Sequence, residues 1–166
     1  MGKQTKITKD KVMVFLDTSK TRNSESWLPA WNRIDKSTVF DLAFNPESEE
    51  VDYIDMPAPT QEISGYKPSL PQEIGCYRGN PIYELVEYMM IHLPVGDDTR
   101  VPALVVWPPR EDGSMEAWQC KDSVLLINNF QPVDGKATFT VDLGGNKDVG
   151  TATVGEDGKP VFVKGE

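Results

Sequence analysis

Acidic side chains are the most abundant chemically active groups in this sequence, and many of them fall in one segment. Between Asp41 and Tyr66 the chain has seven Asp or Glu residues and no Lys or Arg. Two carboxylates at a suitable separation are enough to hydrolyse a glycosidic bond by acid–base catalysis. A hydrolase that uses Glu49, Glu50 and Asp52 is therefore one hypothesis. An acidic chain offers such pairs almost everywhere, however, and a solvated surface that keeps the protein soluble accounts for the same residues.

The other reactive side chains lack the partners that catalysis needs. Nucleophilic catalysis requires a base beside the nucleophile. The only histidine, His92, falls in the last turn of a predicted helix, where it would cap backbone carbonyls. Cys76, without a histidine partner, is expected to pack as a small hydrophobic residue. Segment 142–148 lacks the alternating oxygen ligands and closing glutamate of a calcium loop. We therefore predict no enzyme activity, no cofactor and no metal site.

Four tryptophans suggest a different class of function, because indole rings can stack on sugars. They are Trp27, Trp31, Trp107 and Trp118. Packing in a core or an interface is the more common use of such rings. A monomeric β-sandwich that binds carbohydrate or peptide through an exposed aromatic patch stays open as an alternative.

Short apolar segments bounded by Pro, Gly and Asn predict that the chain is mainly β. Residues 137–143 give the clearest pattern, since Ala137, Phe139 and Val141 alternate with polar residues. An Asp–Gly pair at 134–135 predicts the tight turn before them. Further strands are predicted at 12–16, 37–44, 51–54, 61–66, 101–107, 124–127, 149–154 and 161–163. Together these segments favour one antiparallel β-sandwich or rolled sheet.

One flanking amphipathic α-helix is predicted at about 80–93. Asn80 is a good N-cap, Pro81 suits the first helical position, and Pro94 stops the helix. Apolar residues between them recur at helical spacing and form one stripe: Ile82, Leu85, Val86, Met89, Met90 and Leu93. At 1.5 Å per residue the helix is about 20 Å long, which is enough to cover one face of a sheet.

The length of 166 residues fits a single domain. We divide the chain into a basic N-terminal arm at 1–11 and one β-rich domain at 12–166. Within the domain, 45–79 is predicted to be a long connector with little regular structure. Pro46 ends the preceding strand there, and an acidic loop at 47–50 follows. Loops of this length in compact domains usually carry function or form interfaces.

The net charge of −9 is unevenly distributed. The arm has four lysines against Asp10, a local charge of +3 that leaves −12 for the rest of the chain. A pI near 4.6 argues against tight binding of nucleic acid, which needs cations to displace phosphate counterions. No apolar run approaches the roughly 18 residues of a membrane span. The two isolated cysteines favour folding in a reducing cytoplasm.

The order of these segments resembles the major tail proteins that form the tail tube of long-tailed bacteriophages and prophages of Gram-positive bacteria. The similarity covers roughly 12–154. The segments that carry it after the N-terminal strand are Ala-Phe-Asn-Pro at 43–46, Glu-Glu-Val-Asp-Tyr-Ile at 49–54, Gln-Glu-Ile-Ser-Gly-Tyr-Lys-Pro at 61–68, Gly-Asn-Pro at 79–81 and Gly-Lys-Ala-Thr-Phe-Thr-Val at 135–141.

The resemblance implies a structural virion protein with a β-sandwich or rolled β core and one flanking helix. Six copies would form a ring, with sheets from all six closing into a β-barrel around a channel. Rings would stack into a tube around a tape-measure protein, together with tail terminator and baseplate or initiator proteins. The tube would later conduct the genome into the host. A tube protein of a contractile tail or phage-like bacteriocin shares this logic and is the nearest alternative.

The resemblance also implies where the tube would assemble and how DNA would pass. Assembly would take place in the cytoplasm of the host bacterium, without membrane insertion. Double-stranded DNA would move through the lumen without specific binding, weakly repelled by any acids that face it. We expect the connector at 46–68 to stack the rings and the arm to order on a neighbouring copy, where opposite charges would fix the register. The candidate inter-ring residues are Glu47, Glu49, Glu50, Asp52, Asp55, Lys3, Lys6, Lys9 and Lys11.

Overall fold

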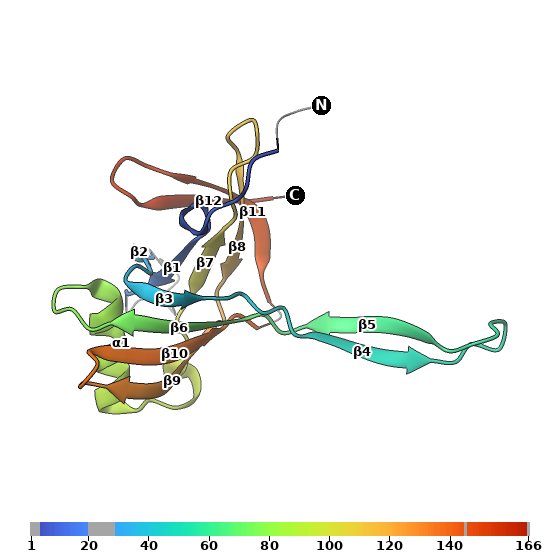
Figure 1. The fold of residues 1–166 in the computed structure, drawn as a ribbon, viewed down its shortest axis with the longest axis horizontal. Coiled ribbons are helices and arrows are strands. Elements are labelled where there is room, and N and C mark those ends of the chain that lie inside the picture. The colour runs from blue at the N-terminus through green and yellow to red at the C-terminus, as the bar shows by residue number, and fades with distance from the viewer. Residues whose placement is uncertain (1–3, 20–28, 145, 166) are drawn as a thin grey trace.

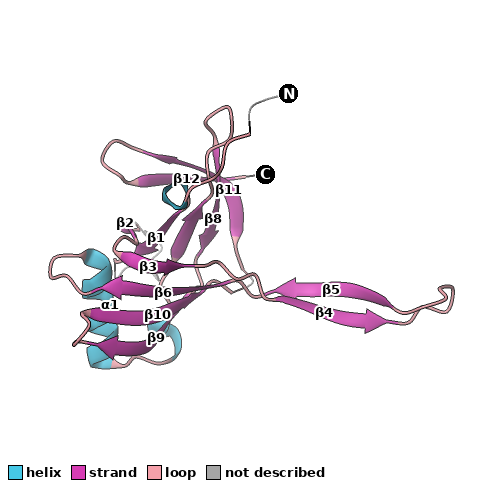
Figure 2. Cartoon of the chain, viewed as in Figure 1, coloured by secondary structure: helices cyan, strands magenta, loops and turns pink. Residues whose placement is uncertain are grey.

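The computed structural model of the chain describes residues 4–19, 29–144 and 146–165. The chain is mainly β, with antiparallel strands in curled sheets and a single α-helix among the described residues (Figures 1 and 2). This confirms the predicted fold class. The division into an arm at 1–11 and one domain at 12–166 stays a prediction.

The largest sheet has six strands and forms the centre of the body. In spatial order they are β12 (Pro160–Lys164), β11 (Asp148–Val154), β8 (Met115–Cys120), β7 (Ala103–Val106), β1 (Met13–Asp17) and β2 (Trp31–Arg33). Every residue of β7 is buried, as are Val14 to Asp17 of β1. Both faces of the sheet are therefore covered here, which explains why these two strands are continuous apolar runs without alternation.

A second sheet has four strands and packs against the first. Its order is β3 (Ser37–Phe40), β6 (Ser69–Gly75), β10 (Lys136–Asp142) and β9 (Val124–Gln131). β3 pairs with β6 as far as Phe40 opposite Gln72, and pairing resumes only at a bridge between Ala43 and Ser69. Pro71 lies in the gap, where it has no N–H to donate to a neighbouring strand. The predicted strand at 37–44 is shorter for this reason.

Helix α1 (Pro81–His92) begins and ends as predicted. The side chain of Asn80 accepts a hydrogen bond from the backbone N–H of Ile82 at 2.9 Å, and Leu93 adopts the left-handed conformation that ends the helix. The buried face consists of Ile82, Tyr83, Val86 and Met89. Leu93 was expected to continue this apolar stripe. It is 71% exposed instead, because the helix ends at His92 and Leu93 has left-handed backbone angles. Short 3-10 turns lie at Lys9–Lys11 (η1) and Gly96–Thr99 (η2).

The main hydrophobic core lies where α1 and the two sheets meet. It joins Phe139 of β10, Ile74 of β6 and Val105 of β7 to the buried face of the helix. A smaller core on the other face of the six-stranded sheet contains Phe15 and Leu104, which alternate with residues of the main core along β1 and β7. No helix in the described part of the chain is long and apolar enough to cross a membrane.

The third sheet is a two-stranded hairpin that projects far beyond the body (Figure 1). Its strands are β4 (Pro46–Val51) and β5 (Thr60–Tyr66), and we call residues 46–66 the hairpin. The expectation of a connector with little regular structure at 45–79 was therefore wrong, since it contains β4, β5 and β6. Pro46 begins a strand, 47–50 is part of that strand and not an acidic loop, and of the predicted strand at 51–54 only Val51 is in one.

Candidate functional site: the hairpin and the sheet edges

The two strands of the hairpin pair from Pro46 opposite Tyr66 to Val51 opposite Thr60, with one irregularity after Glu47, but neither strand buries a side chain. This register places Glu49 opposite Glu62 and Ser48 opposite Ile63. No residue of β4 or β5 is buried. Because side chains alternate along a strand, Glu49 and Glu62 share one face, while Glu50 and Ile63 lie on the other. Both faces of the hairpin are therefore available to a partner.

Negative charge dominates this projection. The sequence from 46 to 66 has six acids and no Lys or Arg. Glu49 and Glu62 are like charges on directly opposed positions, an arrangement that destabilises a strand pair. The Tyr53 hydroxyl donates a hydrogen bond of 2.5 Å to Glu62, which raises the pKa of Tyr53. At the base, Lys67 Nζ lies 2.8 Å from the Glu47 carboxylate, and this contact raises the pKa of Lys67.

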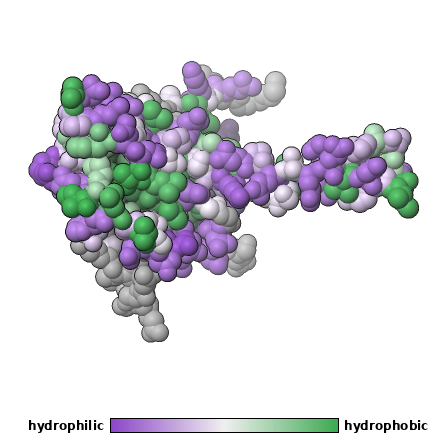
Figure 3. All heavy atoms as spheres, turned by 90° about the horizontal axis from the view of Figure 1, so that it is seen from below, coloured by the Kyte–Doolittle hydropathy of each residue, from purple (hydrophilic) through white to green (hydrophobic). Residues whose placement is uncertain are grey.

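The tip of the hairpin, residues 52–59, is apolar as well as acidic. Every residue in it is exposed, and Ile54 is 107% exposed while Met56 is 46% exposed. Pro57 and Pro59 stiffen the turn because each ring fixes its φ angle. The space-filling view shows apolar side chains at the far end of an otherwise mostly polar projection (Figure 3). An apolar tip held this far from the body is suited to insertion into another surface.

A cluster of aromatic rings and a strained asparagine hold the root of the hairpin. Phe44 stacks on Trp107 with 6.5 Å between ring centroids and meets the edge of Trp118 at 6.2 Å. We call these three residues the root cluster. Asn45 has a φ of 46°, and its side-chain amide donates to the Lys67 carbonyl at 3.0 Å. These contacts fix the direction in which the hairpin leaves the body.

The tryptophans are used for packing. Trp31 is 6% exposed in the smaller core, and Trp107 and Trp118 are half-buried in the root cluster, 5.1 Å apart. Lys147 Nζ lies 5.1 Å from the Trp118 ring centroid, which is a cation–π contact. Trp27 lies outside the described residues. The three described tryptophans therefore do not line an open platform for a sugar ring.

The predicted basic residues lie at a different place from the predicted acids. Lys6 and Lys11 are exposed, Lys9 begins the η1 turn, and Lys3 lies outside the described residues. In Figure 1 the described part of the N-terminal segment lies at the top of the body, whereas the hairpin extends to one side. The acids Glu47, Glu49 and Glu50 lie along β4, and Asp52 and Asp55 lie at the tip. Within one copy the structure does not bring the described members of the two groups together.

The four-stranded sheet offers a second candidate surface, its outer face, which points away from the core. In the paired registers of this face the charged residues are Glu73, Lys136 and Asp142. Lys136 Nζ lies 3.0 Å from the Glu73 carboxylate, and Lys136 and then Thr38 hold the pKa of Glu73 below its usual range. The rest of the face is uncharged: it includes hydroxyl and amide groups, such as Asn128, which donates to Thr140 at 2.9 Å, and the exposed apolar residues Val39 and Leu126.

The remaining candidate residues make packing and ion-pair contacts. The His92 ring packs on Tyr88 with 4.3 Å between centroids in the last turn of α1. Burial raises the pKa of Cys76, and it raises that of Cys120 to about 12. Arg78 bonds to Glu84 and Glu87 and joins the loop before α1 to the first turns of the helix.

Sequence reasoning found the acids of the hairpin and, at 61–66, most of β5, but it missed β4, the apolar tip and the root. β4 reads Pro-Glu-Ser-Glu-Glu-Val and is exposed, so it lacks the apolar alternation that predicts a strand. The available signal was the pair of segments 51–54 and 61–66, which are separated by Pro57 and Pro59. Two adjacent strand-like segments with a proline-rich turn between them indicate a hairpin.

Comparison with known proteins supports the fold. No protein-family model and no curated protein matches the sequence. Among solved structures, the fold is similar to a chain in the cryo-EM structure of the anti-feeding prophage cap, which is the tube-terminating cap. The TM-score is 0.51 at 11% identity, over 92% of this chain and 95% of that chain. This likeness shows that the two chains share an overall fold.

Two further structures give lower scores. A chain from the sheath/tube terminator of an extracellular contractile injection system (PVC), in the extended state, has a TM-score of 0.48 at 9% identity, covering 88% of this chain and 97% of that one. A chain from the anti-feeding prophage baseplate has a TM-score of 0.46 at 8% identity, covering 89% and 97%.

Proposed function

We propose that this chain is a structural subunit of a phage-type tail, which forms hexameric rings that stack into a tube. The observation that carries the proposal is the hairpin. It is rigidly rooted, exposed on both faces and apolar at its tip, and a hairpin of two strands is marginally stable alone. Burial against another molecule would stabilise such a hairpin. The shared fold with a chain of a tube-terminating cap supports the same class of function.

The four-stranded sheet supplies a way to form the ring. Its outer strands are β3 and β9, and in the described chain each pairs with a strand on one side only; the free edge of β9 makes one bridge, between Val124 at its start and Arg100. The four strands alternate in direction, so β9 of one copy runs antiparallel to β3 of a second copy placed in the same orientation. An even number of alternating strands therefore allows identical copies to join head to tail without a mismatched pair, which removes both open edges.

In such a ring the outer face of this sheet would line the channel. Its main charge pair, Glu73 with Lys136, is internally neutralised, and the Thr38 hydroxyl also donates to Glu73. The acids of the hairpin, which were predicted to be inter-ring contacts, lie outside this face. Passage of double-stranded DNA without specific binding would then depend on the absence of a strong charge of either sign.

The hairpin would connect one ring to the next. Its length and its acidic, apolar-tipped surface suit insertion against an adjacent ring, with Glu47, Glu49, Glu50, Asp52 and Asp55 in the contact. The partners would then be further copies of this chain, a tape-measure protein, a tail terminator and baseplate or initiator proteins. The place of action would be the virion, after assembly in the host cytoplasm.

The fold likeness to the anti-feeding prophage cap favours widening the proposal beyond long-tailed phages of Gram-positive hosts. A tube subunit of a contractile tail or a phage-like bacteriocin would use the hairpin and the closure of the sheet in the same way. The two cases differ in whether a sheath protein accompanies the tube, and isolation of the particle with its companion proteins distinguishes them.

The test is negative-stain electron microscopy of the purified protein at high concentration, with a mass measurement on the same sample. We expect rings or striated tubes with a central hole, and a mass that is a multiple of 18.5 kDa. A chain that stays monomeric after a tape-measure fragment and an initiator complex are added would contradict the proposal. That result would favour a monomeric binding module for carbohydrate or peptide.

A further inference from the structure

The hairpin lacks a third strand on the side of β5. In the described chain β5 pairs with β4 alone, so the backbone N–H and C=O groups on its outer edge face solvent. Open edges of this kind accept an added strand, because the backbone is already extended and its unpaired N–H and C=O groups can each form a hydrogen bond with the new strand. An added strand would also stabilise a hairpin that buries no side chain of its own.

The two faces of β5 specify the sequence of the strand that fits it. Glu62 lies on one face, and Ile63, which is 58% exposed, lies on the other. A complementary strand therefore has a cation and an apolar side chain at successive positions, since successive side chains point to opposite faces. Residues 46–66 include six acids and no Lys or Arg, so a strand that binds here should itself be positively charged.

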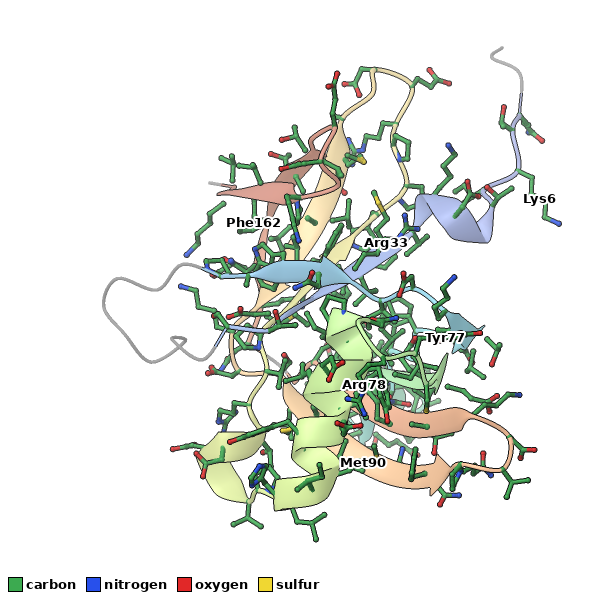
Figure 4. The ribbon with its side chains drawn as sticks, turned by 90° about the vertical axis from the view of Figure 1, so that its left-hand side faces the viewer. Lys6, Arg33, Tyr77, Arg78, Met90 and Phe162 are labelled. Carbon is green, nitrogen blue, oxygen red and sulfur yellow. The ribbon has the colours of Figure 1, made fainter. Side chains whose placement is uncertain are left out.

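The N-terminal arm of the same chain has this pattern. Residues 4–8 belong to no strand, and they include Lys6 followed by Ile7, which is 64% exposed. Thr5, Ile7 and Thr8 are β-branched and suit an extended conformation. Figure 4 shows Lys6 near the outer end of this segment with its side chain directed away from the body. In Figure 1 the arm lies away from the hairpin of its own copy.

We propose that residues 4–8 of a second copy add to the outer edge of β5 as a third strand. Lys6 then lies on the face of Glu62, and Ile7 packs beside Ile63 on the opposite face. The inference rests on the proposed function, because it takes neighbouring copies of the chain as given. It deepens that function by assigning the contact to backbone strand pairing and by naming the residues that set its register.

Disulfide formation between two different chains tests the contact directly. One chain carries Ile7→Cys and the other Ile63→Cys, both with Cys76→Ser, and one has an affinity tag to separate it by mass. Cys120 stays in place because it is 1% exposed, with its pKa raised to about 12. After mixing, assembly and oxidation, we expect a disulfide-linked dimer that contains one chain of each variant. Each variant oxidised separately should give no disulfide-linked dimer. The matched control replaces Ile63→Cys with Val133→Cys, since Val133 is 97% exposed in the turn between β9 and β10.

Charge reversal supplies a second readout that does not depend on cysteine chemistry. Lys6→Glu and Glu62→Lys should each raise the protein concentration needed for assembly several-fold, and the double variant should return towards the wild-type value. Rings or tubes that form without the mixed disulfide and without this rescue would overturn strand addition and leave the tube proposal standing. A chain that neither assembles nor forms the disulfide would overturn both.

Discussion

The hairpin and the β6–β10–β9 sheet are built from the same kind of antiparallel pairing, yet they differ completely in what they bury. In β10, Ala137, Phe139 and Val141 are all 0% exposed, whereas no residue of β4 or β5 is buried. Net stability from a backbone hydrogen bond is about 0.5–1.5 kcal/mol, and burial of apolar side chains supplies the rest. The hairpin is therefore held by backbone pairing alone. The sheet is also stabilised by its buried apolar side chains, so it can remain folded without a partner.

The largest effect should come from the core that only the sheet possesses. Phe139→Ala removes a fully buried ring between the two sheets and α1. We expect a loss of about 3–5 kcal/mol in the free energy of unfolding, measured by denaturant titration. Val133→Ala, at an exposed turn, is the control and should change stability by less than about 0.5 kcal/mol. A loss for Phe139→Ala as small as that of the control would contradict this description of the core.

The root cluster connects the two regions, and its removal should have an intermediate effect. Phe44→Ala deletes the ring that contacts Trp107 and Trp118. The expected loss is about 0.5–1.5 kcal/mol, the range for aromatic pairs, with a marked loss of assembly because the hairpin direction is released. The control for stability is Tyr53→Ala, which removes an exposed aromatic ring outside the root cluster and should leave the unfolding curve unchanged. If Phe44→Ala unfolds normally and still assembles, the root does not orient the hairpin.

Acid should weaken the body through Glu87. Arg78 and then Tyr83 hold the pKa of Glu87 below its usual range, and the unfolded chain lacks these contacts. A lowered folded-state pKa contributes stability above the ordinary Glu range, and this contribution is lost as pH falls through the folded-state pKa. Glu87→Gln should therefore melt earlier than wild type near neutral pH, with the difference shrinking in acid. An equal difference in Tm at both ends of the pH range would rule this linkage out.

The smallest effect should be a gain, confined to the hairpin. Glu49→Gln removes the repulsion with the opposed Glu62 and should stabilise the isolated hairpin by about 0.2–1 kcal/mol. Slower hydrogen exchange of the β4 and β5 amides would report it, while global unfolding stays the same. Exchange that becomes faster would show that Glu49 stabilises the hairpin through a contact other than the opposed pair.

The same contrast explains how much of the fold follows from the sequence. Helix α1 was predictable because Asn80 and Pro81 mark its start and the apolar spacing marks its face. β10 was predictable because Phe139 and its neighbours alternate with polar residues. Both patterns arise because one face of the element is buried against other parts of the same chain. β6 was missed because Pro71 and the buried Gln72 interrupt its pattern, and β8 because its alternation is irregular.

The candidate site was only partly predictable for the same physical reason. The acids Glu47 to Asp55 and the basic arm stand out by charge, and charge can be read without a structure. β4, which carries the first three of these acids, buries nothing in the isolated chain, so its sequence has no apolar periodicity, whereas β5 was predicted at 61–66. The root cluster joins residues 44, 107 and 118, whose contact arises only from the packing of strands distant in sequence.

The most direct test of the central claim is hydrogen exchange measured on the same protein before and after assembly. The account predicts that the amides of 46–66 exchange quickly in the isolated chain and become strongly protected in rings or tubes, whereas those of β10 are protected in both. Hairpin amides that are equally protected in the isolated chain, or that stay unprotected in the assembled form, would contradict the claim that the hairpin is completed by a partner.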